Sequence, residues 1–205
     1  MIGEASRFTM GVPEAGRFGY HFAVILQNEN NMLYGAYSMN ICEIQVLAID
    51  PGTENLGWCV VCGNQRAQRF IDGGVARVAS AKTEMGLKKI FDAVSELICK
   101  FHPDTLVVES PFFGKNTKTL IRLGEARGAI LLAAALANVR VAQLTPAEAK
   151  LALTGNGNAR KEQVAYMVKM ILAPTKDLAL DASDAAAVAV AFLHKYRPTT
   201  MSSNP

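Results

Sequence analysis

The stretch CEIQVLAIDPGTENLGW, residues 42–58, decides the fold. It opens with an apolar run rich in β-branched residues over 44–49, which is typical of a buried central strand. Asp50 follows, and the sequence PGT then turns the chain. From Gly57 the pattern is extended and apolar again, which predicts a hairpin. A bare carboxylate at the end of a buried strand is costly without a compensating cation, so Asp50 is either a turn residue or part of a charged site.

The same arrangement of strand, acid and proline recurs further along the chain. The apolar run TLVV at 105–108 predicts a short buried strand, and Glu109 follows it. If both strands are parallel neighbours, Asp50 and Glu109 lie side by side at the carboxyl edge of the sheet, where α/β folds place their sites. Asp181 and Asp184 are three residues apart at the start of a predicted helix, so they share a face. The helix dipole accounts for one such acid, and two favour a functional cluster.

The order of predicted elements defines the fold class. Strands at 44–49, 57–62 and 67–78 have short connections and predict an antiparallel meander, with a bulge or kink at Gly73-Gly74. Apolar residues three and four apart predict a helix over 84–101. Strands at 105–108 and 140–144 and helices at 117–137, from 145, at 160–172 and from 180 complete the order βββ-α-β-α-β-α-α-α. We therefore expect an α/β fold, with a mixed five-stranded sheet flanked by helices.

Composition limits how many domains the chain can form and which partners it requires. Its 205 residues are 50% hydrophobic and 19% charged, enough for one good core. The 21 Lys and Arg against 18 Asp and Glu neither require nor exclude a nucleic-acid partner. We expect an N-terminal extension at 1–40 that is either dispensable or the product of an upstream start of translation, then one folded domain at 41–197 and a disordered tail at 198–205. No apolar run approaches the roughly 20 residues of a membrane span.

The cysteines favour a reducing, cytoplasmic location. Cys59 and Cys62 form a C-x-x-C pair, but a strand would direct them to opposite faces, and no second pair follows at zinc-site spacing. We interpret all four cysteines, Cys42, Cys59, Cys62 and Cys99, as small buried hydrophobes.

The four acids predict metal-dependent chemistry. Carboxylates as close as Asp50, Glu109, Asp181 and Asp184 would repel one another unless divalent cations neutralised them. Oxygen-only ligands select hard ions, Mg²⁺ or Mn²⁺. Two such ions about 4 Å apart can activate a water and stabilise the leaving oxygen in phosphodiester cleavage.

Basic and aromatic residues near this edge suit nucleic acid. The basic residues that could hold phosphates are Lys115, Lys118, Arg122, Lys150, Arg160 and Lys161. Phe112 and Phe113 belong either to the core or to a wedge that stacks on bases. The second half of the helix at 117–137 is apolar almost all round, which predicts burial in both a core and an interface.

Four separated blocks, AIDPGTENLGW, VVESPFFGKNTKTLIRLGEARG, LTGNGNARKEQV and LDASDAAAVAVAF, resemble the RuvC family of Holliday junction resolvases over about residues 43–195. The resemblance implies an RNase H-like fold and a homodimer that nicks two opposed strands of a four-way DNA junction symmetrically with Mg²⁺. The family's catalytic, metal-binding carboxylates match Asp50, Glu109, Asp181 and Asp184. Its two basic residues important for DNA and catalysis match Lys150 and Lys161.

The resemblance also implies partners and further site residues. Phe112 matches the aromatic that enters the junction, and the helix at 117–137 matches the dimer-forming helix. Two Mg²⁺ ions per active site are implied, with Mn²⁺ as a substitute, and Lys161 would position the scissile phosphate or the water. The products would carry a 5′-phosphate and a 3′-hydroxyl. A branch-migration helicase complex is the implied partner.

Three other functions fit parts of this pattern. A junction-binding protein without cleavage would not need all four acids. A ribonuclease H acting on RNA–DNA hybrids would need neither the Phe112 wedge nor the dimer helix. Actin- and Hsp70-like ATPases also follow a strand-ending Asp with a Gly-Thr loop, but they need a second, duplicated domain, for which 205 residues leave no room.

Overall fold

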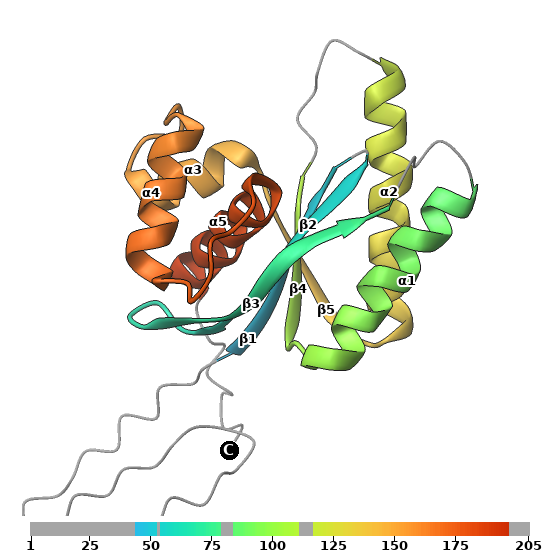
Figure 1. Ribbon diagram of the computed structural model, residues 1–205, viewed down its shortest axis with the longest axis horizontal. Coiled ribbons are helices and arrows are strands. Elements are labelled where there is room, and N and C mark those ends of the chain that lie inside the picture. Colours follow the sequence, from blue (N-terminus) through green and yellow to red (C-terminus); the bar gives the residue numbers. More distant parts are fainter. Residues whose placement is uncertain (1–43, 53, 79–83, 111–116, 197–205) are drawn as a thin grey trace, which may run out of the picture. The chain divides into compact units, whose positions relative to one another are not determined.

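The computed structural model describes residues 44–52, 54–78, 84–110 and 117–196 (Figure 1). The expected extension at 1–40, the tail at 198–205, Cys42, and the candidate DNA-binding residues Phe112, Phe113 and Lys115 lie outside these residues.

The secondary structure follows the predicted order. The strands are β1 (Ile44–Pro51), β2 (Asn55–Gly63), β3 (Gln68–Arg77), β4 (Thr105–Glu109) and β5 (Arg140–Leu144). The helices are α1 (Glu84–Phe101), α2 (Thr117–Leu136), α3 (Pro146–Thr154), α4 (Lys161–Leu172) and α5 (Leu180–Lys195). Within the described ranges, none of these helices is both long enough and apolar enough to cross a membrane.

The strands form one mixed sheet in the order β3-β2-β1-β4-β5. β1, β2 and β3 are antiparallel neighbours, which confirms the predicted meander, while β1, β4 and β5 run parallel to one another. The central position of β1 explains its continuous apolar run, because a central strand covered by helices is buried on both faces.

Two helical layers cover the sheet (Figure 1). α3, α4 and α5 lie on one face and pack against Val46 and Ala48 of β1, whereas α1 and α2 lie on the other and pack against Leu47 and Ile49. Each of these four β1 side chains is fully buried, and full burial of a Val, Leu or Ile contributes about 1.5–3 kcal/mol. Side chains alternate along a strand, so Asp50 follows Val46 and Ala48 onto the α5 face.

The bulge in β3 is not at the glycine pair, so the prediction of a bulge at Gly73-Gly74 was wrong. Phe70 and Asp72 pair with consecutive residues of β2, which leaves Ile71 as the extra residue. Gly74 instead lies against the indole of Trp58, and a Cβ built on Gly74 would come within 3.2 Å of that ring. The missing side chain therefore makes room for the tryptophan.

The prediction that the cysteines are buried holds only for some of them. Cys59 is buried on the α5 face of the sheet, and burial raises the pKa of its thiol to about 12, which makes it an unreactive apolar side chain. Cys62 is half-buried. Cys99 is exposed on α1, which contradicts the expectation that all the cysteines are buried.

Candidate active site

The ends of two parallel strands bring the first pair of acids together. Ile49 of β1 is paired with Val108 of β4, so Asp50 and Glu109 come next on adjacent strands. Both side chains lie on the α5 face, and they share a hydrogen bond. This is the side-by-side placement expected from the repeated strand–acid–proline pattern.

The first turns of α5 supply the second pair. Asp184 lines the same hollow as Asp50 and Glu109. Asp181 does not line this hollow, but its negative charge reaches Asp50 and raises the pKa of that carboxyl. All four predicted acids therefore converge on the carboxyl ends of β1 and β4.

Gly57 permits this convergence and was not identified from the sequence. It is paired with Asp50 across the β1–β2 hairpin. A Cβ built on Gly57 would overlap the backbone carbonyl of Asp181, so α5 can approach β2 only because position 57 has no side chain. A glycine inside a strand pattern is a known sign of such close approach, and this signal was present in the sequence.

Two lysines face the acids. The hollow has a volume of about 210 Å³, and its lining includes Lys150 of α3 and Lys161 at the first position of α4. The Nζ atom of Lys161 lies 2.7 Å from Oδ2 of Asp184, an ion pair. Three other predicted phosphate-binding residues that the structure describes do not line this hollow: Lys118 and Arg122 lie in the first turns of α2, and Arg160 is the N-cap residue of α4.

The electrostatics show that the two strand-end acids are only partly compensated by the nearby lysine charge. Burial, followed by the charges of Asp184 and Asp181, raises the pKa of Asp50 to about 6. Burial, followed by the charges of Asp50 and Asp184, raises the pKa of Glu109 to about 7. Lys161 opposes both shifts without cancelling them. Carboxyl groups in this condition gain from any added cation.

The donor atoms fit a hard divalent cation. The four acids offer only carboxylate oxygens, which suit Mg²⁺, Mn²⁺ or Ca²⁺ rather than softer metals. Among the described residues, no three acidic, histidine or cysteine side chains are arranged so that they could together hold a metal ion as they stand. At Asp184 the Lys161 ammonium takes one of the oxygens that a metal ion would use.

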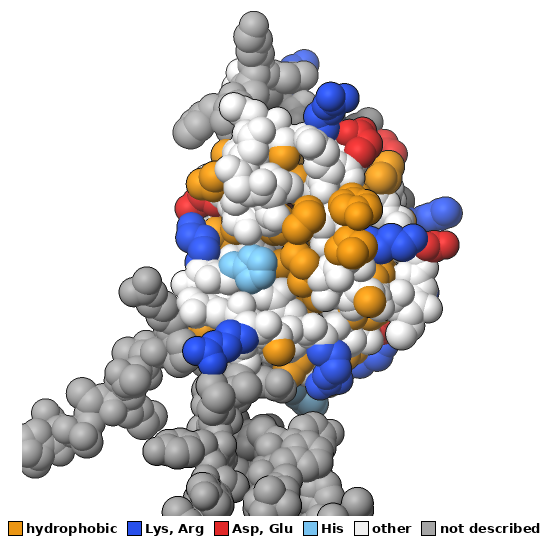
Figure 2. Space-filling model, turned by 90° about the vertical axis from the view of Figure 1, so that its left-hand side faces the viewer, with side chains coloured by type: hydrophobic (Ala, Val, Ile, Leu, Met, Phe, Trp, Pro, Cys, Tyr) orange, Lys and Arg blue, Asp and Glu red, His pale blue; other side chains and the backbone are white. Residues whose placement is uncertain are grey.

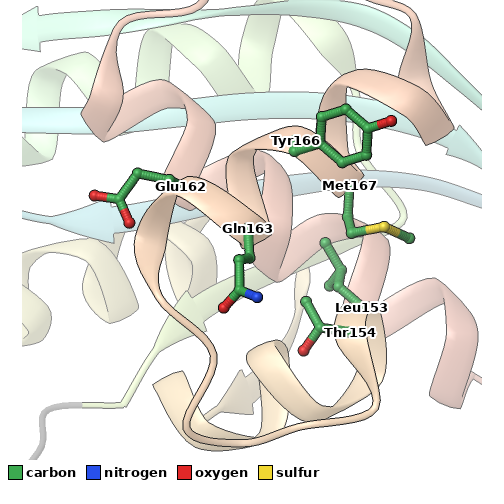
Figure 3. Close-up of a pocket in the computed structure, with 6 residues that line it drawn as sticks. All are labelled: Leu153, Thr154, Glu162, Gln163, Tyr166 and Met167. Atoms are coloured by element: carbon green, nitrogen blue, oxygen red, sulfur yellow. The ribbon is translucent and has the colours of Figure 1, made fainter.

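A larger hollow lies nearby on the outer side of the same helical layer. It has a volume of about 480 Å³ and lies between the end of α3 and α4, where Tyr166, Met167 and Leu153 line it with Thr154, Glu162 and Gln163 (Figure 3). Figure 2 faces this side of the molecule and shows hydrophobic side chains gathered there. Its lining contains a single acid and no base, so it lacks the groups that phosphodiester chemistry requires. We therefore place the candidate active site at the smaller hollow.

Comparison with known proteins agrees with this architecture. Residues 46–192 match the family model described as crossover junction endodeoxyribonuclease RuvC. The chain belongs to the RuvC family. The matched segment contains Asp50, Glu109, Asp181 and Asp184, together with both lysines of the hollow.

Individual RuvC proteins match over most of their length. The RuvC of Shewanella sp. (strain MR-4) is 37% identical over 149 residues, which cover 73% of this chain and 86% of that protein. The RuvC of Alkalilimnicola ehrlichii is 40% identical over 151 residues, covering 74% and 92% of the two chains. The structure of T. thermophilus RuvC in complex with a Holliday junction substrate superposes with a TM-score of 0.69 at 32% identity, covering 74% and 94%. The expected RNase H-like fold of the RuvC family is thereby confirmed.

Proposed function

We propose that this RuvC-family protein is a structure-selective endonuclease, which resolves four-way DNA junctions during recombination and repair by metal-dependent hydrolysis. The observation that carries the proposal is the placement of Asp50, Glu109 and Asp184 in one hollow with Lys150 and Lys161. Metal-dependent hydrolysis of a phosphodiester requires both kinds of residue, because carboxylates hold the cations and ammonium groups hold the phosphate. The similar proteins, which are crossover junction endodeoxyribonucleases and a RuvC in complex with a Holliday junction, support this substrate.

Each of the four acids and two lysines of the site then has a chemical role. Asp50, Glu109, Asp181 and Asp184 would hold two Mg²⁺ ions, or Mn²⁺ in their place. Bound ions of this kind activate water and stabilise a leaving oxygen. Lys161 and Lys150 would hold the oxygens of the scissile phosphate, which the acids alone would repel. The products would be a 5′-phosphate and a 3′-hydroxyl.

DNA outside the hollow would contact the region before and at the start of α2. Lys118 and Arg122 lie in the first turns of this helix and would contact the backbone of the junction arms. Lys115 and the wedge residue Phe112 precede the helix and belong to the same proposal. A branch-migration helicase complex is the further partner that we expect.

The outer face of α2 supports a homodimer. Ile121, Leu132 and Leu136 are exposed by 57%, 54% and 67%. With Gly124 and Gly128 they form an apolar stripe along the helix, and a Cβ on either glycine would meet no atom within 4 Å. Glycines four residues apart allow two helices to pack closely. We therefore propose that α2 packs against α2 of a second copy, which would give a two-fold-symmetric enzyme for a two-fold-symmetric junction.

A substrate panel tests the proposed function. A four-way junction, a linear duplex and an RNA–DNA hybrid of the same sequence are each incubated with the intact protein and Mg²⁺, and labelled products are resolved on a denaturing gel. We expect paired nicks at symmetric positions in the junction and little cutting of the duplex or hybrid. Junction binding without nicks would indicate a binding protein, and equal cutting of the hybrid would indicate a ribonuclease H-type enzyme.

A further inference from the structure

The ion pair between Lys161 and Asp184 places a cation inside the acidic cluster. Nζ of Lys161 lies 2.7 Å from Oδ2 of Asp184, and the Lys161 side chain is 72% exposed while that of Asp184 is 28% exposed. The aspartate therefore points into the hollow, whereas the lysine reaches it from solvent.

The charge of Lys161 acts on more than its direct partner. It lowers the pKa of both Asp50 and Glu109, against the effect of their burial. In turn, the hydrogen bond and charge of Asp184, with smaller contributions from Asp50 and Glu109, raise the pKa of Lys161. One ammonium group thus interacts with three of the four acids that a metal ion would bind.

The backbone of Lys161 is held at the start of a helix, whereas its side chain is largely exposed to solvent. Lys161 is the first residue of α4, directly after the N-cap residue Arg160, whose backbone N–H donates a 3.0 Å hydrogen bond to Oε1 of Gln163. The side chain is four methylenes long and largely solvated, so its ammonium can change partners by rotation alone. An ion pair this exposed is weak and can be displaced.

We propose that Lys161 acts as the counter-ion of the cluster in the metal-free protein, and that a divalent cation displaces its ammonium from Asp184 and thereby releases it to hold the scissile phosphate. The second half of this proposal rests on the proposed function, while the first half concerns the protein and the metal alone. Lys161 would then couple loading of the metal to engagement of DNA. A lysine that only contacts phosphate would not compete with the metal.

Metal binding without DNA separates these two cases. Mn²⁺ is titrated into the intact protein, Lys161→Met and Lys161→Arg, and free Mn²⁺ is measured by its electron paramagnetic resonance signal. We expect Lys161→Met to bind Mn²⁺ about threefold to tenfold more tightly, because a positive charge close to the ion has been removed. Lys161→Arg should bind like the intact protein. The control is Lys169→Met, which removes an exposed charge two turns along the same helix and should leave the affinity unchanged. Equal or weaker binding by Lys161→Met would overturn the proposal.

Thermal unfolding gives a second readout that also guards against a misfolded variant. In EDTA, Lys161→Met should melt at a lower temperature than the intact protein, since the acids have lost their counter-ion. In excess Mn²⁺ this difference should disappear or reverse. A deficit of equal size in both conditions would mean that Lys161 is merely structural, which would overturn the counter-ion role.

Single-turnover cleavage of a four-way junction at saturating Mg²⁺ tests the second half. Lys161→Met should cleave at least about tenfold more slowly than the intact protein and Lys169→Met, because it lacks the released ammonium. If the intact protein does not cleave junctions at all, the proposed function fails while the two DNA-free measurements still decide the counter-ion role. Full-speed cleavage by Lys161→Met would overturn the release step.

Discussion

At the scale of single residues, the site combines acids that the fold disfavours in their ionised form. Asp50 and Glu109 are set into the ends of buried strands, and burial raises the pKa of each. A group whose folded pKa is raised binds a proton that the unfolded chain has already released. Stability therefore falls as pH rises through the window between the ordinary and the raised pKa, and above that window the full penalty remains unless a cation offsets it.

Asp50→Asn should therefore stabilise the metal-free protein. The folded pKa of Asp50 is about 6 against an ordinary value of 3.8, so the penalty develops between about pH 4 and 6 and is complete at pH 7.5. Removing the charge should raise the free energy of unfolding in EDTA by about 1 to 3 kcal/mol. Chemical denaturation at pH 7.5 measures this change. Asp92→Asn, at a partly exposed position on α1, should not stabilise the protein, and an unstable Asp50→Asn would contradict the electrostatic interpretation.

Metal affinity should also depend on pH, over the range in which Asp50 and Glu109 lose their protons in the folded protein. The acids must be deprotonated to bind a cation, and the pKa values of Asp50 and Glu109 are about 6 and about 7. Mn²⁺ affinity should therefore rise steeply from pH 5 to about 7 and level off above it, with protons released on binding. Calorimetry in buffers of different ionisation enthalpy measures both effects. A flat affinity from pH 5 to 8 would show that these two acids are not ligands.

At the scale of secondary-structure elements, the position of α5 depends on Gly57. A methyl group at this position would overlap the Asp181 carbonyl, so Gly57→Ala should push the first turn of α5 away from β2. Overpacking of this kind costs about 1–3 kcal/mol of stability. Junction cleavage should fall by at least about tenfold, because Asp181 moves with the backbone. Gly157→Ala is the control for stability, since its added Cβ would meet no atom closer than 3.4 Å. Unchanged cleavage by Gly57→Ala would contradict this role.

The proposed dimer interface lies on α2. Leu132→Glu puts a charge into the middle of the exposed apolar stripe, and it should convert a dimer to a monomer without loss of helix content. Sedimentation equilibrium at micromolar concentration gives the mass. The matched control is Met85→Glu, which alters an exposed apolar side chain on α1 and should leave the dimer intact. A monomeric intact protein, or a dimeric Leu132→Glu, would refute the α2 interface.

The order of elements and the acids could be predicted because their signals are local. A strand period followed by an acid and a proline identifies Asp50 and Glu109 without knowledge of the fold, and a shared helix face identifies Asp181 with Asp184. The remaining features depend on contacts distant in sequence. The ion pair of Lys161 with Asp184 depends on how α4 packs beside α5, and the role of Gly57 depends on how closely α5 approaches β2.

The wrong prediction of a bulge at Gly73-Gly74 also arose from a contact between residues distant in sequence. A glycine pair in a strand indicates either a bulge or a close neighbour, and the choice at Gly73-Gly74 depends on Trp58 of the adjacent strand. Cys99 is exposed because it lies on the face of α1 that the sheet does not cover. The residue type alone does not show which face that is.

At the scale of the whole molecule, the sheet carries the acids and the helices complete the site. The parallel pair β1 and β4 places two carboxylates at one edge, α5 adds two more, and α3 and α4 add the lysines. The sheet and α5 thus contribute the acids, while α3 and α4 contribute the bases. Two such sites related by a dimer axis through α2 would match the two opposed strands of a junction.

Cleavage of a labelled synthetic four-way junction, compared between the intact protein and Asp50→Asn, tests the central claim most directly. With Mg²⁺, the intact protein should produce paired symmetric nicks, whereas Asp50→Asn should bind the junction with similar affinity and produce none. Nicks by Asp50→Asn at a rate close to that of the intact protein would show that the acidic cluster at the ends of β1 and β4 is not the catalytic centre.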